Sequence, residues 1–364
     1  MEVKSYNKKA LFEFINSEIF LNLSNLPISR HRAISQINNP RASDDDILLI
    51  VQFDGNKVVG YMGMLPDYVH VQGKQEKIYW FSCFWVDDEY KSKNVAANLF
   101  LRSIRACKMN VFITNIVPWL EPVYQKTKIF KPTIYKNGYR GYLRFNLTEI
   151  LPPKSDYFKK ATILLKAIDG TLNFFNGIRL LFFVKYKLDN IRYEYLHEID
   201  SSSSNFIDSY KIKHWTQRGV EDINWIIKNP WIIEGANTDF NSSRYYFSSL
   251  DTCFFYQIIK FYDSKNNMIG IMMTCVRGNN LTVPYAFFEE NYNEIACKFL
   301  INKMIDLKLN MITIFNKELV SVFNQMKTPF LFHKEIKKPY LISKNFDSIN
   351  DLSFQDGDGD CAFY

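Results

Sequence analysis

The chain has 364 residues, of which 47% are hydrophobic and 16% aromatic. This is enough apolar material for a large core, but the length exceeds what one core usually serves, so we expect two domains. Charged residues make up 23% and no low-complexity block is present, which excludes extensive disorder. The net charge of +7 is modest and diffuse, so it gives no support for a nucleic-acid partner.

The cysteines and the first residues indicate a cytoplasmic protein. The six cysteines are far apart and form no CxxC pair, which is typical of reduced, mostly buried thiols. The N-terminal residues lack the pattern of a signal peptide, and no apolar run approaches the roughly 20 residues of a membrane-spanning helix. The five histidines show no paired-ligand spacing, and Asp356–Asp360 lacks the sixth-position glycine and distal glutamate of a calcium loop. We therefore expect no metal.

The first 150 residues alternate between helix and strand periodicity. In chain order the predicted elements are helix 8–22, strands 47–53, 58–64 and 76–86, helix 94–107, strand 111–116, a helix ending near 127, and strand 139–147. Asp54-Gly55-Asn56 joins the first two strands with strong hairpin-turn chemistry. Pro152-Pro153 then fits neither a helix interior nor a central strand, so we expect a domain boundary there.

The next segment, residues 154–187, is helical and basic, with seven lysines and arginines and several aromatic residues. We interpret it as a packed connecting helix, or a pair of helices broken near Gly170 and Gly177. Contact with a membrane surface or an acidic ligand is the alternative.

The second half repeats the order of helices and strands of the first, with a weaker pattern. Its predicted elements are a capped helix running toward 211, helix 218–228, strands 254–262 and 268–276, helix 293–309, strand 311–315 and helix 317–326. A strand pair, a helix, a strand and a helix thus occur in the same order in both halves.

The segment Phe84–Leu99 carries the most specific pattern. A strand ending at Val86 leads through Lys91, Ser92, Lys93, Asn94, Val95, Ala96 and Ala97 into a helix. Such a turn points unpaired backbone N–H groups and the positive end of a helix dipole at one spot, which suits a pyrophosphate. The segment resembles the acyl-CoA signature of the GNAT N-acetyltransferase superfamily, with Lys91 in the basic position, Asn94 in place of the first glycine and Ala96 as the second small residue.

A second segment, Val123–Phe130, resembles the later GNAT pattern L-Y-E-K-x-G-F. The resemblance implies that Tyr124 protonates the departing CoA thiolate, which a phenol can do while staying protonated at neutral pH. It also implies direct attack by an acceptor amine or hydroxyl, with the carbonyl oxygen held by a backbone N–H near Phe84 to Val86. The general base stays open between Glu76, His70, Asp87 and an ordered water.

The corresponding turn of the second half carries Glu289, Glu290 and Glu294 at its helix start. Acids there stabilise a helix and repel phosphate, so we expect this half not to bind CoA in the same way. The expected division is an acyl-CoA-binding GNAT domain over 1–150, a helical connector over 151–194, a degenerate GNAT-like domain over 195–346 and a C-terminal tail over 347–364. The expected fold class is α/β (α+β), with a mixed, mostly antiparallel sheet flanked by helices in each domain.

The resemblance as a whole implies an acyltransferase that uses acetyl-CoA or another acyl-CoA as co-substrate. We expect a small-molecule or sugar acceptor, with an amino sugar or nucleotide sugar as a candidate. Two alternatives stay open: a tRNA-dependent aminoacyltransferase of the kind that builds peptidoglycan cross-bridges, and a non-catalytic CoA-binding or scaffold protein.

Overall fold

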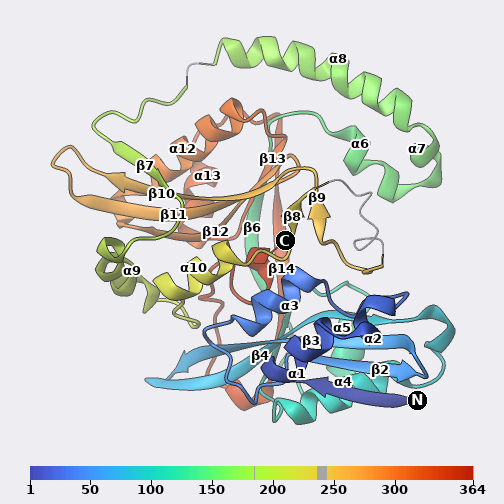
Figure 1. The fold of residues 1–364 in the computed structure, drawn as a ribbon. Helices are drawn as coiled ribbons and strands as arrows, with labels where there is room; N and C mark the ends of the chain where they lie inside the picture. The colour runs from blue at the N-terminus through green and yellow to red at the C-terminus, as the bar shows by residue number, and fades with distance from the viewer. Residues whose placement is uncertain (184, 236–243, 364) are drawn as a thin grey trace. The chain divides into compact units, whose positions relative to one another are not determined.

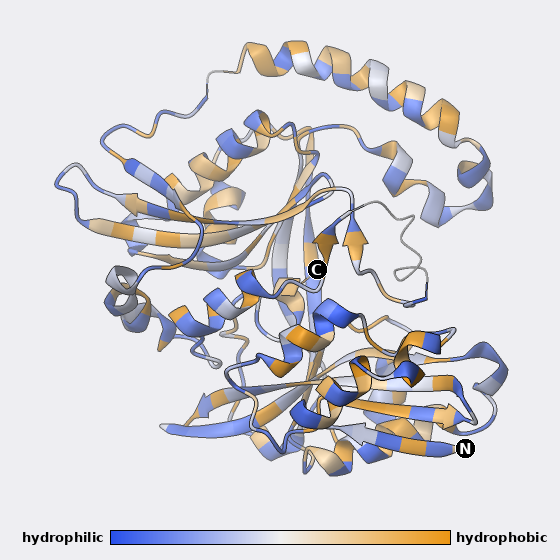
Figure 2. Ribbon diagram, in the orientation of Figure 1, coloured by the Kyte–Doolittle hydropathy of each residue, from blue (hydrophilic) through white to orange (hydrophobic). Residues whose placement is uncertain are grey.

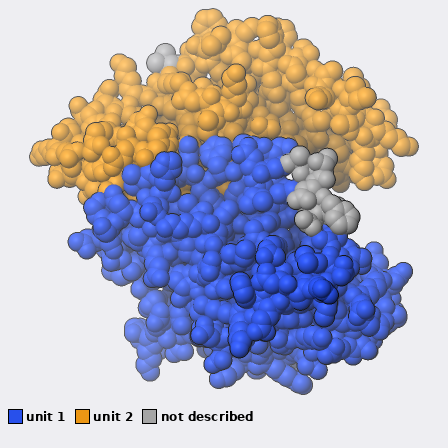
Figure 3. Space-filling model, in the orientation of Figure 1, with its two compact units in different colours: residues 1–136, 196–258, 338–364 blue, residues 137–195, 259–337 orange. Residues whose placement is uncertain are grey.

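The residues that the computed structural model describes, 1–183, 185–235 and 244–363, form two units that each combine distant segments of the sequence (Figure 3). Unit 1 comprises Met1–Lys136, Leu196–Ile258 and Lys338–Tyr364, and unit 2 comprises Asn137–Tyr195 and Ile259–Lys337. The sequence predicted continuous domains instead. The difference arises because residues 196–258 and the C-terminal residues make their contacts with the first 136 residues.

Unit 1 is built on a sheet with the strand order β1-β2-β3-β4-β5-β14, in which β4 and β5 run parallel and the other neighbours run antiparallel. Its strands are β1 (Glu2–Tyr6), β2 (Leu49–Asp54), β3 (Lys57–Val71), β4 (Lys74–Val86), β5 (Val111–Thr114), the end of β14 (Phe332–Ile342), and the separate pair β8 (Ile233–Glu234) and β9 (Leu250–Asp251). Its helices are α1 (Lys8–Ile15), α2 (Glu18–Asn22), α3 (Arg30–Ile37), α4 (Val95–Ala106), α5 (Glu121–Lys126), α9 (Ser204–Lys211) and α10 (Val220–Lys228).

Unit 1 has helices on both faces of its sheet (Figure 1), and the alternation of side chains along β2 gives each face a separate core. Leu49, Val51 and Phe53 join a core formed with α1, α2 and α3, whereas Ile50 points to the other face and joins a core formed with α4 and α5. This is the period of two expected for a strand buried on both faces. The sheet therefore presents α4 and α5 together on one face.

Unit 2 has the strand order β6-β13-β12-β11-β10-β7, with β12 and β13 parallel. Its strands are β6 (Ile134–Tyr142), β7 (Arg192–Leu196), β10 (Phe254–Tyr262), β11 (Met268–Arg277), β12 (Asn280–Phe288) and β13 (Met311–Ile314), with β6, β7 and β10 crossing a unit boundary at one end. Its helices are α6 (Leu147–Ile150), α7 (Asp156–Lys160), α8 (Thr162–Leu181), α12 (Asn293–Asp306) and α13 (Lys317–Gln325).

The segment 154–187 contains a pair of helices, α7 and α8, but the break between them lies at Ala161 and not near the predicted Gly170 and Gly177. Helix α8 runs without a break through Gly170 and Gly177, at neither of which a Cβ would meet an atom within 4 Å. Much of its apolar surface is exposed. Val184 of this segment lies outside the described residues. Over the described part of the chain, no helix combines the length and apolar character needed to cross a bilayer.

Candidate functional site

The end of β4 carries a bulge at Cys83 and Phe84. Tyr61 on β3 faces Trp85, and Gly63 faces Ser82, so β4 has one residue more than β3 between these pairs. Cys83 adopts the left-handed region with φ 53°. A bulge interrupts the ladder of backbone hydrogen bonds and redirects the neighbouring side chains. The regular pairing of β4 with β3 is therefore interrupted at Cys83 and Phe84.

Strands β4 and β5 pair where the middle of β4 meets the start of β5, with Tyr79 facing Val111 and Trp80 facing Phe112. Beyond these pairs lies a cavity of about 330 Å³, lined by residues 81–84 of β4 and 113–117 of β5 and the loop after it. Its apolar lining residues are Met62, Phe81, Phe84, Ile113, Ile116, Val117, Leu120 and Phe247, and its polar ones are Ser82, Cys83, Thr114, Asn115, Tyr124 and Asp360. We call this space the β4–β5 cavity.

Tyr124 reaches the β4–β5 cavity from α5. Its ring packs 5.7 Å from that of Phe100 on α4 and 6.0 Å from that of Phe130. Burial raises the pKa of its phenol to about 12. The phenol therefore stays protonated at neutral pH and can serve as a proton donor.

Asp360 brings a carboxylate to the same cavity from the end of the chain. Ser82 donates a hydrogen bond from its hydroxyl to Oδ2 of Asp360. Arg32 of α3, which is buried, donates to Oγ of Ser82 at 3.1 Å and to the phenolic oxygen of Tyr245 at 2.7 Å, and contacts Sγ of Cys83. A buried cation therefore lies behind the wall that carries Asp360 and Cys83.

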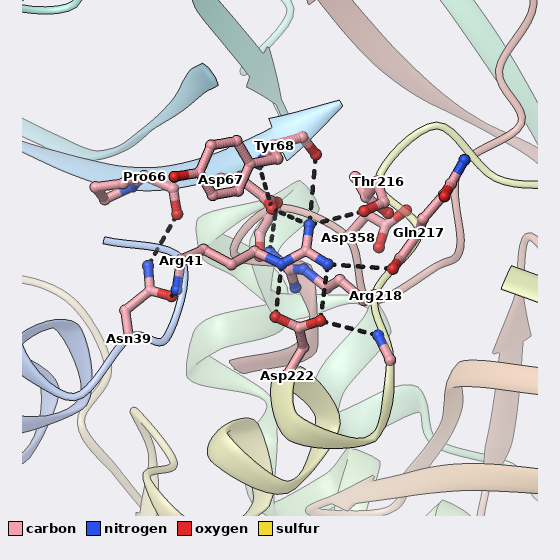
Figure 4. Close-up of polar contacts among 12 residues, drawn as sticks. Asn39, Arg41, Pro66, Asp67, Tyr68, Thr216, Gln217, Arg218, Asp222 and Asp358 are labelled. Atoms are coloured by element: carbon pink, nitrogen blue, oxygen red, sulfur yellow. Dashed lines mark hydrogen bonds and ion pairs between the residues drawn. The ribbon is translucent and has the colours of Figure 1, made fainter. Parts of the chain in front are cut away.

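The residues around Asp360, the terminal segment 354–363, are held inside unit 1 by buried charges (Figure 4). Arg218 donates to the carbonyl oxygens of Gly357 and Gly359, each at 3.2 Å, and to Asp67 at 2.7 Å. Asp67 also accepts from Arg41 at 2.8 Å, and Arg41 forms a bidentate pair with Asp222. Each buried charge in this chain of contacts has an opposite charge beside it, which offsets the cost of desolvation.

The pKa values of two acids in this network, Asp67 and Asp358, are shifted in opposite directions. Burial alone would raise the pKa of Asp67, but Arg218 and Arg41 more than offset it, so that pKa lies below its ordinary value. Burial raises the pKa of Asp358 instead.

The neighbouring Gly359 has φ 71°, and a Cβ there would lie 2.8 Å from the Trp80 ring, so glycine is needed at this position. The backbone just before Asp360 is thus fixed by Arg218 and by the close contact of Gly359 with Trp80.

The turn before α4, residues 88–97, we call the α4 turn. Asn94 precedes the helix in the left-handed conformation, with φ 60° and ψ 14°, and its side chain makes no capping hydrogen bond. The backbone N–H groups of the first helical turn have no partner within the helix. A Cβ at Gly60 would lie 2.8 Å from the side chains of both Val95 and Leu99, so this glycine lets α4 approach β3 closely.

The structure places the predicted site residues in two groups. Phe84 and Tyr124 line the β4–β5 cavity, and Val86 ends β4 opposite Gly60. The others belong to the α4 turn: Lys91, Ser92, Lys93, Asn94 and Ala97 are exposed, Ala96 is half-buried and Val95 is buried in the core. Lys91 pairs with Asp88 at 2.5 Å, and the ammonium of Lys93 lies 3.9 Å from the centre of the Tyr90 ring.

None of the side chains considered as a general base from the sequence lines this cavity. Asp87 pairs with Lys57 at 3.0 Å, and Glu76 is exposed. His70 lines a different cavity of about 570 Å³, together with Arg41 and Lys211. Asp360, which does line it, was missed because it is 236 residues after Tyr124, and only its surroundings distinguish it from the other acids of the terminal segment.

No family model matches the sequence, and no curated protein matches it. Solved structures match most of the chain. A protein of unknown function from Enterococcus faecalis V583, described as a probable N-acyltransferase, has a TM-score of 0.51 at 10% identity, with 94% of this chain and 73% of that chain covered. This likeness confirms the predicted GNAT-like fold, a mixed, mostly antiparallel sheet with flanking helices.

Two further structures match over a similar range. Saccharomyces cerevisiae N-myristoyltransferase with bound myristoyl-CoA has a TM-score of 0.49 at 9% identity, with 94% of this chain and 78% of that chain covered. The GCN5-related N-acetyltransferase from Anabaena variabilis has a TM-score of 0.48 at 10% identity, with 93% and 72% covered.

Proposed function

We propose that the chain is an acyltransferase that moves an acyl group from acyl-CoA to an amine or hydroxyl in the β4–β5 cavity of unit 1. The observation that carries this proposal is the meeting of a neutral phenol, Tyr124, and a carboxylate, Asp360, on the wall of a cavity beside a strand bulge. Acyl transfer needs these groups: a proton donor for the leaving thiolate, a proton acceptor for the attacking group, and N–H donors for the oxyanion.

The α4 turn fits the pyrophosphate of CoA. It presents a helix N-terminus whose first residues are Val95, Ala96 and Ala97, so no large side chain blocks the approach of a phosphate to the backbone. Lys91 and Lys93 add positive charge, and no acid occurs from Tyr90 to Asn98. Phe100 links this turn to the cavity, because its ring lies 6.1 Å from Phe81 and 5.7 Å from Tyr124.

The proposed reaction has no acyl-enzyme. The acceptor nitrogen or oxygen attacks the thioester carbonyl carbon, and the resulting oxyanion accepts hydrogen bonds from backbone N–H groups of the bulged residues Cys83 and Phe84. Asp360 removes the acceptor proton. As the C–S bond breaks, Tyr124 donates its proton to the CoA sulfur, so the products are the acylated acceptor and CoA thiol. Ser82 donates a hydrogen bond to Asp360, and Arg32 donates to Ser82, so these two side chains hold Asp360 from behind.

The proposal can be tested by measuring release of free CoA thiol. Acetyl-CoA and longer acyl-CoAs would be offered with a panel of amines and hydroxyl compounds, beginning with amino sugars and nucleotide sugars. We expect thiol release that depends on one class of acceptor. If acyl-CoA is neither bound nor consumed, the acyl-CoA proposal is wrong, and aminoacyl-tRNA binding would then separate the tRNA-dependent alternative from a scaffold role.

Cys83 offers an independent probe of where acyl-CoA binds. It lines the β4–β5 cavity, and its thiol is only partly buried. Iodoacetamide labelling followed by peptide mass spectrometry should show slower alkylation of Cys83 when acetyl-CoA is present. Cys253, which is also partly buried but does not line this cavity, serves as the internal control. Equal protection of both cysteines would count against binding in the cavity.

A further inference from the structure

Helix α8 has its apolar face outward. Eight large apolar side chains between residues 163 and 182 are exposed, four of them Ile163 at 87%, Phe174 at 66%, Leu181 at 84% and Phe182 at 83% of their full surface. The complete set is Ile163, Leu164, Ile168, Phe174, Phe175, Ile178, Leu181 and Phe182. At 3.6 residues per turn they fall within an arc of about 140°, which contains no charged residue. Figure 2 shows apolar residues along the whole length of this helix.

The side of α8 that faces the rest of unit 2 buries only two leucines, Leu165 and Leu180, and carries three polar side chains between them. Asp169 accepts from the backbone N–H groups of Leu147 at 2.8 Å and Thr148 at 2.9 Å. Asn173 exchanges two hydrogen bonds with the backbone of Phe145, at 2.9 and 2.8 Å, and Asn176 donates to the carbonyl oxygen of Leu143 at 2.9 Å. A surface helix of a water-soluble protein normally has the opposite arrangement.

These hydrogen bonds fix the rotation of α8 about its own axis. Turning the apolar arc inward would break the contacts of three side chains, Asp169, Asn173 and Asn176, with one backbone segment, residues 143–148. Each of these backbone groups would then lose its partner, which costs more than an ordinary hydrogen bond contributes. The exposed apolar arc is therefore held in place by the fold.

The charges around the arc are mainly positive. Lys154, Lys159 and Lys160 precede the helix, Lys166 lies on it, and Lys187 follows it. Lys185 pairs with Asp306, and Arg179 donates to the carbonyl oxygen of Pro329, so these two side chains contribute less. Of the acids in the same range, Asp156 pairs with Lys159 at 2.7 Å, and Asp169 is turned toward the protein. An apolar face bordered by lysines complements the acyl chains and anionic headgroups of a lipid surface.

We propose that α8 binds the surface of an anionic phospholipid membrane, lying in the interface with its apolar arc among the acyl chains and its lysines at the headgroups. The 20 residues of the helix extend about 30 Å along that surface. This binding requires neither acyl-CoA nor an acceptor, so it stands or falls separately from the proposed activity.

Co-sedimentation of the full chain with vesicles tests the proposal. Vesicles of phosphatidylcholine with one quarter phosphatidylglycerol would be compared with phosphatidylcholine alone, at 0.1 M and 0.5 M salt. We expect binding to the anionic vesicles that weakens at high salt. A variant with Phe174→Ser and Phe175→Ser should lose at least tenfold in the partition coefficient, and Lys160→Glu with Lys166→Glu should act mainly on the anionic vesicles.

The matched control is Phe12→Ser with Leu21→Ser. These two side chains lie in unit 1, and they are 57% and 58% exposed, similar to Phe174 and Phe175. Because all these side chains are exposed, every variant should unfold at the temperature of the parent. Only the control variant should bind vesicles as strongly as the parent. Absence of binding, or an equal loss in the control, would overturn the proposal. A dimer in solution that Phe174→Ser and Phe175→Ser dissociates would also overturn it, because a second copy would then cover the arc.

Discussion

Each unit contains a strand bulge, and the two bulges have different chemical surroundings. In unit 1, β4 has its extra residue at Cys83 and Phe84. In unit 2, Met273 faces Tyr285 and Cys275 faces Thr282, so β12 also has one extra residue, at Val283 and Pro284, two residues further from the end of its strand than the bulge of β4. Gly60 faces the last residue of β4, and Gly270 faces the last residue of β12. Both units therefore contain a bulged strand that a glycine of the neighbouring strand faces at its last residue.

The turns that follow these strands differ in charge. The α4 turn offers Lys91, Lys93 and small residues at the helix start, whereas the turn before α12 has Glu289, Glu290 and Glu294. Positive charge attracts a phosphate to a helix N-terminus, and three acids repel it. Unit 1 also receives the terminal segment with Asp360. A similar strand arrangement is therefore not enough for the proposed chemistry, which also depends on a few charged side chains.

The largest effect should come from removing the carboxylate that unit 1 acquires from the terminal segment. Asp360→Asn removes the proposed proton acceptor, so we expect turnover to fall by about 10²–10⁴-fold with acyl-CoA affinity retained. Steady-state thiol release and a binding titration would measure both. Asp347→Asn, at an exposed acid before the terminal segment, is the control. Turnover within twofold of the parent in Asp360→Asn would exclude Asp360 as the base.

A pH titration of stability sharpens the comparison from the side of unit 2. Burial lowers the pKa of Lys303 on α12 to about 8. Between that pH and the ordinary value near 10.5, the unfolded chain holds the proton and the folded chain does not, so stability should rise with pH. The rise amounts to at most about 3 kcal/mol. Urea unfolding of the parent and of Lys303→Met, from pH 7.5 to 10, should show it in the parent alone; parallel curves would contradict it.

Tyr124→Phe tests the other proton transfer. Without the phenol the thiolate must leave unprotonated or take its proton from water, so we expect turnover to fall by about 10–100-fold, with acyl-CoA affinity little changed. Tyr135→Phe, which removes an exposed phenol bound to Glu121, is the control. An unchanged turnover number in Tyr124→Phe would remove this residue from the mechanism.

The smallest effects should come from the two equivalent glycines. A Cβ at Gly270 would lie 2.2 Å from the ring of Phe288, whereas one at Gly60 would meet the flexible ends of Val95 and Leu99 at 2.8 Å. We expect each Gly→Ala change to cost about 1–3 kcal/mol of unfolding free energy, with Gly270→Ala the more costly. Only Gly60→Ala should also weaken acyl-CoA binding, by a few-fold, because it displaces the first turn of α4. Equal loss of affinity in both variants would contradict this assignment.

Much of the fold was predictable because the local patterns are strong. Strand 254–262 was predicted residue for residue as β10, and helix 94–107 corresponds closely to α4. The predicted helix 8–22 is interrupted, because Ser17 accepts a hydrogen bond from the N–H of Phe20 and starts a new helix there. Helix α3 and strands β12 and β14 were missed. Helix α3 has a polar sequence whose place is set by tertiary contacts such as those of Arg32.

The candidate site was predictable only where its residues are close in sequence. The α4 turn and Tyr124 lie in recognisable local segments. Arg32, Ser82 and Asp360 come together only in the folded chain, and Ser82 and Asp360 are 278 residues apart in the sequence. Nothing in the local sequence distinguishes Asp360 from Asp356 or Asp358. The outward apolar arc of α8 was likewise hidden, because the pattern of the helix shows an amphipathic element but does not show which face is covered.

The most direct test of the central claim is calorimetric titration of acetyl-CoA into the parent and into two charge variants. Ala96→Glu places an acid at the α4 turn, and Glu294→Lys changes charge at the corresponding turn of unit 2. We expect the parent and Glu294→Lys to bind acetyl-CoA with the same affinity, and Ala96→Glu to bind at least tenfold more weakly. Absence of binding by the parent, or equal binding by Ala96→Glu, would contradict the assignment of the acyl-CoA site to unit 1.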